Sequence, residues 1–276
     1  MTPGDSALTI QGRRLETRWA GPPPSAAPTL VLLHEGLGCV ALWKDFLERL
    51  AELTGCGVLA YSRAGYGQSD PVELPRPLTY MHEEAREVLP RVLDAANVRD
   101  AVLIGHSDGA SIALINAGAV HDPRVRGVVL MAPHVFTEPM GLASIRAARE
   151  AYGHDENGLE SRLREGLARY HADVDVAFRG WNDAWLDPAF EAWNLEGFIA
   201  GIDCPLLLIQ GRDDEYGTRA QLTAIESRAP GASQTLLLDD CRHSPHRDRP
   251  EATLAAIHDF VAGLALPITE EKPAHV

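Results

Sequence analysis

One serine in this sequence has the neighbours that a nucleophilic serine needs. Ser107 is the centre of the pentapeptide GHSDG, residues 105–109, which has the pattern G-x-S-x-G. An apolar run precedes the pentapeptide and a stretch of small residues follows it. A strand, a tight strained turn and a helix in this order would expose the serine hydroxyl at a helix N-terminus, where the helix dipole favours negative charge. The alternative is a serine in a strand–helix turn that does no chemistry.

A serine hydroxyl is a poor nucleophile at neutral pH, so it needs a base, and the base needs an acid that orients it. Two later loops supply these residue types in the order serine, acid, histidine. Asp213 and Asp214 follow one apolar run, and one of the two could instead cap the next helix. His243 follows another run and is the predicted base, whereas we expect His246 on the surface or behind the site. Two histidines at this spacing could suggest a metal pair, but no third ligand lies nearby in sequence, so we expect no metal.

Acyl transfer also needs hydrogen-bond donors for a developing oxyanion. The backbone N–H of Asp108, directly after the serine, is one candidate. The other is Gly36, in the glycine-rich loop 34–38 that follows the first buried run. The alternative for this loop is a tight turn into the next helix.

The elements that would position these residues follow from alternating apolar runs and helix-like stretches. Six apolar runs predict strands covered on both faces: 29–34, 57–62, 101–106, 125–131, 205–210 and 234–238. Five stretches have helical patterns: 41–53, 80–96, 110–120, 219–228 and 250–264. This alternation predicts a mostly parallel sheet with helices on both faces, and 7–10 with 15–19 predict an antiparallel hairpin at its edge.

The interval 133–203 interrupts this alternation. It has no strand-like run, and it holds three of the five tryptophans, namely Trp181, Trp185 and Trp193. We expect an inserted helical cap over the carboxyl edge of the sheet, with residues 1–132 and 204–276 forming the core domain. The alternative is a pair of ordinary crossover helices, although a crossover of this length is unusual.

Four stretches, in the right order, resemble the α/β-hydrolase superfamily: the oxyanion loop 32–36, the loop 62–70, the pentapeptide 105–109, and the C-terminal blocks 211–214 and 242–243. The resemblance covers nearly the whole chain and implies an α/β-hydrolase fold. In the family the acid commonly stands three residues after a glycine. Together with Ser107 and His243, this implies Asp214 as the acid.

Two positions depart from the family pattern. Arg242 stands where a glycine typically precedes the histidine, and Glu35 stands where the oxyanion loop usually has glycine. A carboxylate that pointed at a developing oxyanion would be unfavourable. We therefore expect Glu35 to face a cation such as Arg63, or to take part in substrate or proton handling. The side chain of Asp108 raises the same question.

The resemblance implies a serine hydrolase that cleaves a carboxylic ester or lactone of a small to medium apolar acyl compound through an acyl-enzyme. Alternatives with the same triad are hydrolysis of a carbon–carbon bond in a ring-fission diketone and hydrolysis of an amide. A hydrolase-like receptor that binds a ligand is the alternative of another class. Dehalogenases and epoxide hydrolases of the family use an aspartate nucleophile, which Ser107 argues against. The side chains expected to contact substrate are Glu35, His106, Trp181 and Trp185, although such aromatic residues more often pack the core of the cap.

Composition limits the classes of partner. The 276 residues have a formal net charge of −14, which argues against nucleic acid and anionic membranes as partners. We expect a small-molecule substrate and no cofactor, and a homodimer remains open. The four cysteines are far apart and predict reduced, mostly buried thiols. No signal peptide or spanning segment is recognised, so we expect the protein in the cytoplasm, with the polar tail 269–276 loosely held.

Overall fold

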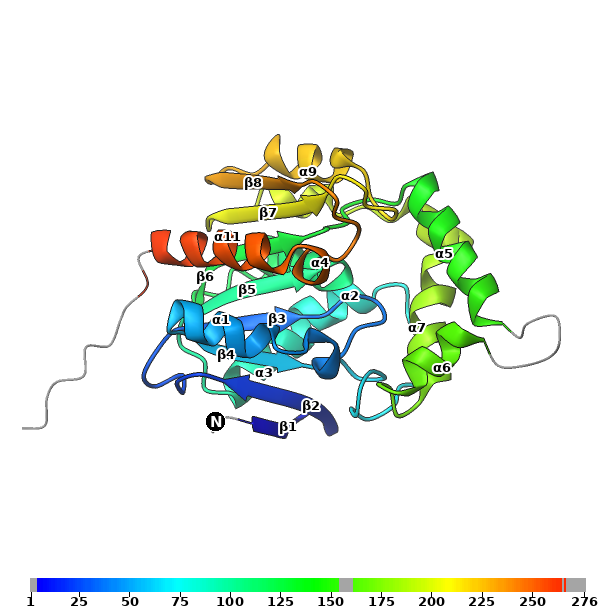
Figure 1. Cartoon of the computed structure of the whole chain (residues 1–276), viewed down its shortest axis with the longest axis horizontal. Coiled ribbons are helices and arrows are strands. Elements are labelled where there is room, and N and C mark those ends of the chain that lie inside the picture. The colour runs from blue at the N-terminus through cyan, green and yellow to red at the C-terminus, as the bar shows by residue number, and fades with distance from the viewer. Residues whose placement is uncertain (1–3, 154–160, 265, 267–276) are drawn as a thin grey trace, which may run out of the picture.

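Eight strands form one mostly parallel sheet (Figure 1). The computed structural model describes residues 4–153, 161–264 and 266, so the tail 269–276 lies outside the described residues. In chain order the strands are β1 (Gly4–Ile10), β2 (Arg13–Ala20), β3 (Thr29–Leu33), β4 (Gly57–Tyr61), β5 (Ala101–His106), β6 (Val125–Met131), β7 (Leu206–Gly211) and β8 (Ser233–Leu238). They lie in the order β1-β2-β4-β3-β5-β6-β7-β8. Strands β1 and β2 pair antiparallel, as does β2 with β4, and the other pairs are parallel.

Helices cover both faces of this sheet. In chain order the α-helices of the described residues are α1 (Phe46–Thr54), α2 (Tyr80–Glu83), α3 (Leu89–Ala95), α4 (Asp108–Ala119), α5 (Pro139–Tyr152), α6 (Arg162–Ala168), α7 (Val174–Trp185), α8 (Glu196–Ile199), α9 (Arg219–Glu226), α10 (Pro245–Asp248) and α11 (Pro250–Gly263). A π-helical turn, Glu84–Val88, joins α2 to α3. Helices α1 and α11 share one hydrophobic core with the sheet, whereas α2 to α4, α8 and α9 share the other. The α/β-hydrolase fold expected from the sequence is confirmed.

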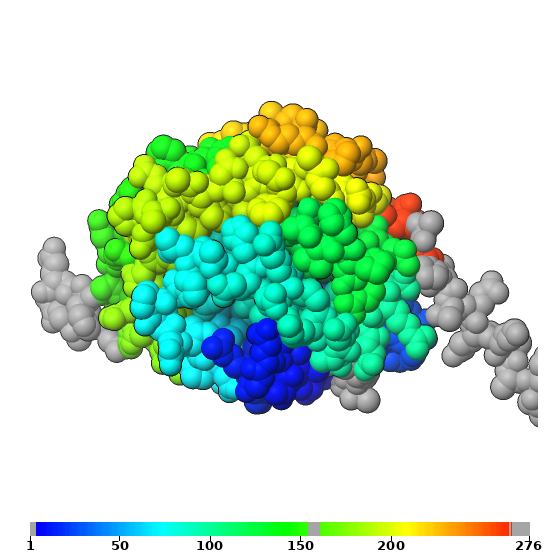
Figure 2. Space-filling model, turned by 180° about the vertical axis from the view of Figure 1, so that it is seen from behind, coloured from blue at the N-terminus to red at the C-terminus, as the bar shows by residue number. Residues whose placement is uncertain are grey.

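Burial on both faces explains why the central strands are apolar throughout. Every residue of β3, β4, β5 and β7 is buried, as expected for parallel strands between two layers of helices. The strand β8 at one end of the sheet is largely exposed. In the view from behind (Figure 2), the blue N-terminal hairpin and the orange C-terminal part lie at opposite edges, in agreement with the strand order.

One predicted helix begins differently. The stretch 41–53 was expected to be continuous, but it contains a 3₁₀ turn, Val40–Trp43, and then a break. Lys44 has a positive φ of 53°, which a right-handed helix does not permit, so α1 starts only at Phe46. The hairpin β1–β2 is antiparallel as predicted and longer at both ends.

In the interval 133–203, the described residues form α5 to α8 and a 3₁₀ turn, Pro188–Ala192. Among its described residues the one β-bridge pairs Phe136 with Asn194. Helices α5, α6 and α7 lie beyond the carboxyl ends of the strands (Figure 1). We propose, on this placement, that residues 133–203 act as a cap.

All four cysteines are free: Cys39, Cys56 and Cys241 are buried and Cys204 is partly buried. Among the described residues, no helix combines the length and the apolar character that a bilayer crossing requires.

Candidate active site

Ser107 lies in a sharp turn between β5 and α4. Its φ of 53° and ψ of −117° are outside the helical and extended regions, so the turn is strained as expected for this type of loop. The helix behind it packs very close to the sheet: a Cβ atom on Gly109 would lie 2.0 Å from the carbonyl oxygen of Leu33. Only glycine fits there, and this close approach fixes Ser107 at the carboxyl edge of the sheet.

Three side chains from different loops form a hydrogen-bonded chain at this edge. The Oγ of Ser107 lies 2.9 Å from the Nε2 of His243, and the Nδ1 of His243 lies 2.8 Å from the Oδ1 of Asp214. Because a carboxylate only accepts, the Nδ1–H of His243 donates to Asp214, which leaves Nε2 to accept the hydroxyl proton of Ser107. The arrangement can activate the serine oxygen as a nucleophile.

The structure also separates the two competing aspartates. Asp213 is exposed, whereas Asp214 is buried. Asp214 Oδ1 also accepts the backbone N–H of Tyr216 at 2.9 Å, and Oδ2 accepts the amide of Gln210 at 3.2 Å. Burial would raise the pKa of Asp214, but its hydrogen bond to His243 and the charge of His243 outweigh burial and lower the pKa to about 2. The carboxylate is therefore ionised throughout the neutral range.

The two candidate oxyanion donors have free backbone N–H groups. Within the described part of the chain, neither Gly36 nor Asp108 donates its N–H to a protein acceptor. Asp108 is the first residue of α4, where the helix dipole adds positive potential. Gly36 lines the same cavity as Ser107.

The side chain of Asp108 is buried and bound by three other side chains. Its carboxylate accepts the hydroxyl of Tyr80 at 2.5 Å and the indole N–H of Trp185 at 3.2 Å, and it lies 3.7 Å from the guanidinium of Arg63. Burial raises the pKa of Asp108, and these partners only partly offset that effect. Tyr80 was not predicted as a functional residue, and its position in the sequence gives no sign of this contact.

Arg63, the example given for a cationic partner of Glu35, does not pair with its carboxylate. Arg63 lies beneath the loop, 1% exposed, and its guanidinium donates to the backbone carbonyl groups of His34 and Glu35 and faces Asp108. The carboxylate of Glu35 instead lies 3.4 Å from the Nδ1 of His106. This difference arises because the backbone carbonyl groups of the loop and the carboxylate of Asp108 engage the two Nη atoms of Arg63, although its buried Nε has no hydrogen-bond partner among the described residues.

Glu35 and His106 together connect the oxyanion loop to the loop of His243. The Nε2–H of His106 donates to the backbone carbonyl of His243 at 2.7 Å, so both ring nitrogens of His106 are engaged. Burial alone would lower the pKa of His106, but the hydrogen bond and charge of Glu35 raise it. Burial would raise the pKa of Glu35, and the same contact with His106 lowers it. The contact lies next to Ser107 and is an ion pair when His106 is protonated, the state that Glu35 favours.

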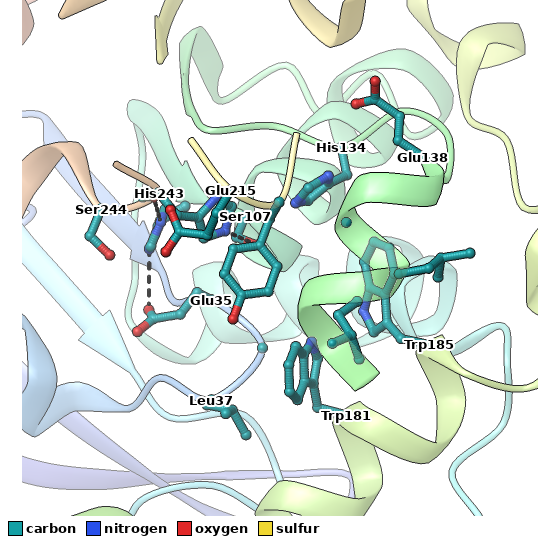
Figure 3. A pocket seen from close by; sticks show the side chains of 16 residues that line it. Glu35, Leu37, Ser107, His134, Glu138, Trp181, Trp185, Glu215, His243 and Ser244 are labelled. Carbon is teal, nitrogen blue, oxygen red and sulfur yellow. Dashed lines mark hydrogen bonds and ion pairs between the residues drawn. The ribbon is translucent and has the colours of Figure 1, made fainter. Parts of the chain in front are cut away.

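Ser107 opens into a cavity of about 190 Å³. Its other lining residues are Glu35, Gly36, Leu37, His106, His134, Glu138, Gly141, Leu142, Ile145, Trp181, Trp185, Glu215, Tyr216, His243 and Ser244. All four side chains expected to contact substrate thus border this space. Figure 3 shows Trp181 and Trp185 on the opposite side of it from His243 and Glu35. Both tryptophans are also buried in the core, so lining the cavity and packing the core are compatible.

Sequence reasoning missed His134, Glu215 and Tyr216 as lining residues. His134 and Glu215 follow the strands β6 and β7 closely. Their position directly after the carboxyl end of a parallel strand could therefore have identified these two residues from the sequence.

His246 is buried, so of the two expected places the surface is excluded and the position behind the site remains. It is 6% exposed, and its ring packs 4.7 Å from Trp43, 5.6 Å from Phe46 and 4.9 Å from His106. It therefore lies behind the site. Within residues 4–153, 161–264 and 266, no three His, Cys, Asp or Glu side chains are grouped as metal ligands.

Lowering the pH from 7 to 5 should lower the free energy of unfolding, and His246→Phe should weaken that dependence. Burial, and then the charge of His106, lower the pKa of His246 to about 3, whereas an unfolded histidine has a pKa of about 6.5. Between these two pKa values only the unfolded chain binds the proton. The contribution of the neutral His246 to the free energy of unfolding is therefore fully present above about pH 6.5, and it falls as the pH falls, by up to about 1.4 kcal/mol per pH unit. Urea unfolding of both proteins at several pH values measures the slopes, and identical slopes would contradict the burial of a neutral His246.

Comparison with known proteins gives matches over most of the chain. The profile of the Alpha/beta hydrolase family matches residues 30–257. A 2-hydroxymuconate semialdehyde hydrolase of Pseudomonas sp. (strain CF600) is 25% identical over 252 residues, covering 84% of this chain and 86% of that protein. Epoxide hydrolase A of Mycobacterium tuberculosis (strain ATCC 25618 / H37Rv) is 24% identical over 325 residues, covering 96% of this chain and 99% of that protein.

The solved structures support the same architecture. The crystal structure of VinJ superposes with a TM-score of 0.74 at 20% identity and covers 95% of this chain and 100% of that one. At this identity the likeness concerns the fold alone.

Proposed function

The chain belongs to the alpha/beta hydrolase family, and we propose that it is a serine hydrolase that cleaves a carboxylic ester or lactone. One observation carries the proposal: the hydrogen-bonded chain from Ser107 through His243 to Asp214 at the edge of a cavity. The substrate is a small molecule, since about 190 Å³ is below the range of roughly 300–1,000 Å³ that is usual for drug-sized ligands.

The proposed reaction has two steps. Ser107 attacks the carbonyl carbon while its proton passes to His243, and the backbone N–H groups of Gly36 and Asp108 stabilise the oxyanion. His243 then gives the proton to the leaving alcohol, and an acyl-enzyme remains. In the second step His243 takes a proton from water, the resulting hydroxide attacks the acyl-enzyme, and the proton returns to Ser107. Asp214 holds the ring of His243 and stabilises its charged form in both steps.

Hydrolysis of a carbon–carbon bond is the second candidate, because the 2-hydroxymuconate semialdehyde hydrolase is similar over most of both chains. The same three side chains could serve that reaction and the hydrolysis of an amide. A receptor that binds a ligand with this fold would show at most a single slow turnover, which separates it from an enzyme.

A fluorophosphonate probe and a panel of substrates test the proposal together. The probe should attach to the peptide that contains Ser107, as measured by mass spectrometry. Short p-nitrophenyl esters and lactones should then be turned over many times, and faster than diketones. Attachment at another residue, or labelling without turnover of any ester or lactone, would contradict the proposed activity.

Gly36→Ala should lower kcat by about ten- to a hundredfold. A Cβ atom at this position would lie 2.2 Å from the Cδ1 of Trp181, so either the indole or the oxyanion loop has to move, and small misplacements of this kind can cost about a hundredfold. Steady-state kinetics on a p-nitrophenyl ester measures the loss. The double variant Gly36→Ala/Trp181→Ala should recover part of it, and wild-type kcat in the single variant would show that the contact is unimportant.

A further inference from the structure

His134 has a buried ring whose nitrogens form no hydrogen bond with any described residue. The side chain follows β6, is 5% exposed and points into the cavity beside Ser107 (Figure 3). Its ring packs edge-on against Trp185 at 5.3 Å and lies 5.5 Å from the ring of His243. Among the described residues, nothing forms a hydrogen bond with either of its ring nitrogens. Neither ring nitrogen is among the fully buried atoms that lack a partner, so the ring reaches the cavity and can pair with a ligand atom there.

His134 offers this ligand a neutral imidazole. Burial, and then the charge of His243, lower the pKa of His134 to about 3. One ring nitrogen therefore donates and the other accepts at neutral pH. The ring can pair with an uncharged oxygen but supplies no positive charge to a carboxylate.

The charges around the cavity also favour an uncharged ligand. Three carboxylates border it, those of Glu35, Glu138 and Glu215, and no Lys or Arg does so within the described part of the chain. Glu35 is paired with His106, and Glu215 lies 3.0 Å from Arg242. The partners of these two carboxylates, His106 and Arg242, are thus already engaged, so a substrate with a free carboxylate would meet like charges without a free cationic partner among the described lining residues.

Glu138 is held outside the reacting region. Its carboxylate accepts hydrogen bonds from Thr218 and Gln221, and Figure 3 shows it pointing away from Ser107. It adds negative charge to the cavity without competing with His134 for the ligand.

We propose that His134 donates a hydrogen bond to an uncharged oxygen in the acyl group, so that the enzyme selects short oxygen-bearing esters and rejects esters with a free carboxylate. The proposal rests on the ester hydrolysis proposed above and names its substrate class. It also disfavours any diketone that carries a free carboxylate.

Two substrates of equal size test the hydrogen bond. p-Nitrophenyl butyrate and p-nitrophenyl methoxyacetate differ by one CH₂ group replaced by oxygen. The ratio of their kcat/KM values in each variant, compared with wild type, cancels the difference in intrinsic reactivity. In His134→Leu the preference for methoxyacetate should fall about five- to tenfold. In His134→Asn, which keeps a donor, it should fall less.

Fluorophosphonate labelling controls for folding, because the labelled fraction counts the intact sites in each variant. An unchanged ratio in a labelled His134→Leu would overturn the role of His134 and leave the proposed esterase activity standing. If wild type hydrolyses no ester, both proposals fail.

A second pair tests the charge. The kcat/KM for hydrolysis of dimethyl succinate, measured by the acid that the reaction produces, should be on the order of a hundredfold higher than the kcat/KM for hydrolysis of monomethyl succinate. Glu215→Gln leaves Arg242 without its carboxylate partner and should narrow this difference. Equal rates on the diester and the monoester in wild type would overturn the exclusion of carboxylates.

Discussion

Ser107→Ala should lower kcat for ester hydrolysis on the order of a millionfold, and His243→Ala should do the same. The expectation follows from the 2.9 Å contact between the two side chains, because neither group can form or resolve an acyl-enzyme alone. Residues that act as one unit have effects that do not add. The double variant should therefore be no slower than either single variant.

The measurement is single-turnover and steady-state kinetics on one p-nitrophenyl ester, with enzyme concentrations high enough to detect the residual rate. The labelled fraction with a fluorophosphonate should be near one for wild type and near zero for Ser107→Ala. Ser107→Ala with more than about a hundredth of the wild-type kcat would show that another group attacks the carbonyl. Effects that multiply in the double variant would show that Ser107 and His243 act in separate steps.

The position of these residues was predictable because strand ends are predictable. The apolar runs 101–106 and 125–131 coincide with β5 and β6, since strands buried on both faces leave few polar positions to obscure their limits. Ser107 follows β5, and the loops of Asp214 and His243 follow β7 and β8. Parallel strands bring their carboxyl ends to one edge, so order along the chain was enough to predict that the three loops meet.

Partner choice inside the site was not predictable in the same way. Arg63 and Glu35 lie 28 residues apart in a loop pair that does adjoin, yet the guanidinium binds the backbone of that loop and faces Asp108. A sequence shows which residues are charged, but it does not show which hydrogen-bond acceptors lie next to a buried cation in the fold. His246 illustrates the same limit, because its burial depends on the packing of Trp43 and Phe46, about 200 residues earlier in the chain.

Local backbone geometry set a second limit. The apolar pattern of 41–53 fits a helix, and yet the positive φ of Lys44 divides it. A lysine in a sequence does not indicate a left-handed backbone conformation, whereas a glycine or an asparagine can.

Asp214→Asn should lower kcat about ten-thousandfold, whereas Asp213→Asn should leave it within about threefold. Asp214 accepts on both oxygens, from His243 and the backbone N–H of Tyr216 on Oδ1 and from the amide of Gln210 on Oδ2. An asparagine NH₂ in either orientation would therefore face a donor. Turning the amide of Gln210 to accept would take away its 2.7 Å hydrogen bond to the carbonyl of Gly217.

The site can relieve this conflict most easily by moving the proton of His243 to Nε2, so that Nδ1 accepts from the new amide. That tautomer presents a donor to Ser107 where a base is needed, which removes general-base catalysis while the fold persists. The loss should therefore lie in kcat, with fluorophosphonate labelling slowed by a similar factor and the melting temperature changed far less. Asp213 is exposed and provides the matched control, because the same change of charge one residue away leaves the hydrogen bonds of His243 intact. Equal losses in the two variants would mean that negative charge in this loop, rather than the orientation of His243 by Asp214, supports the reaction.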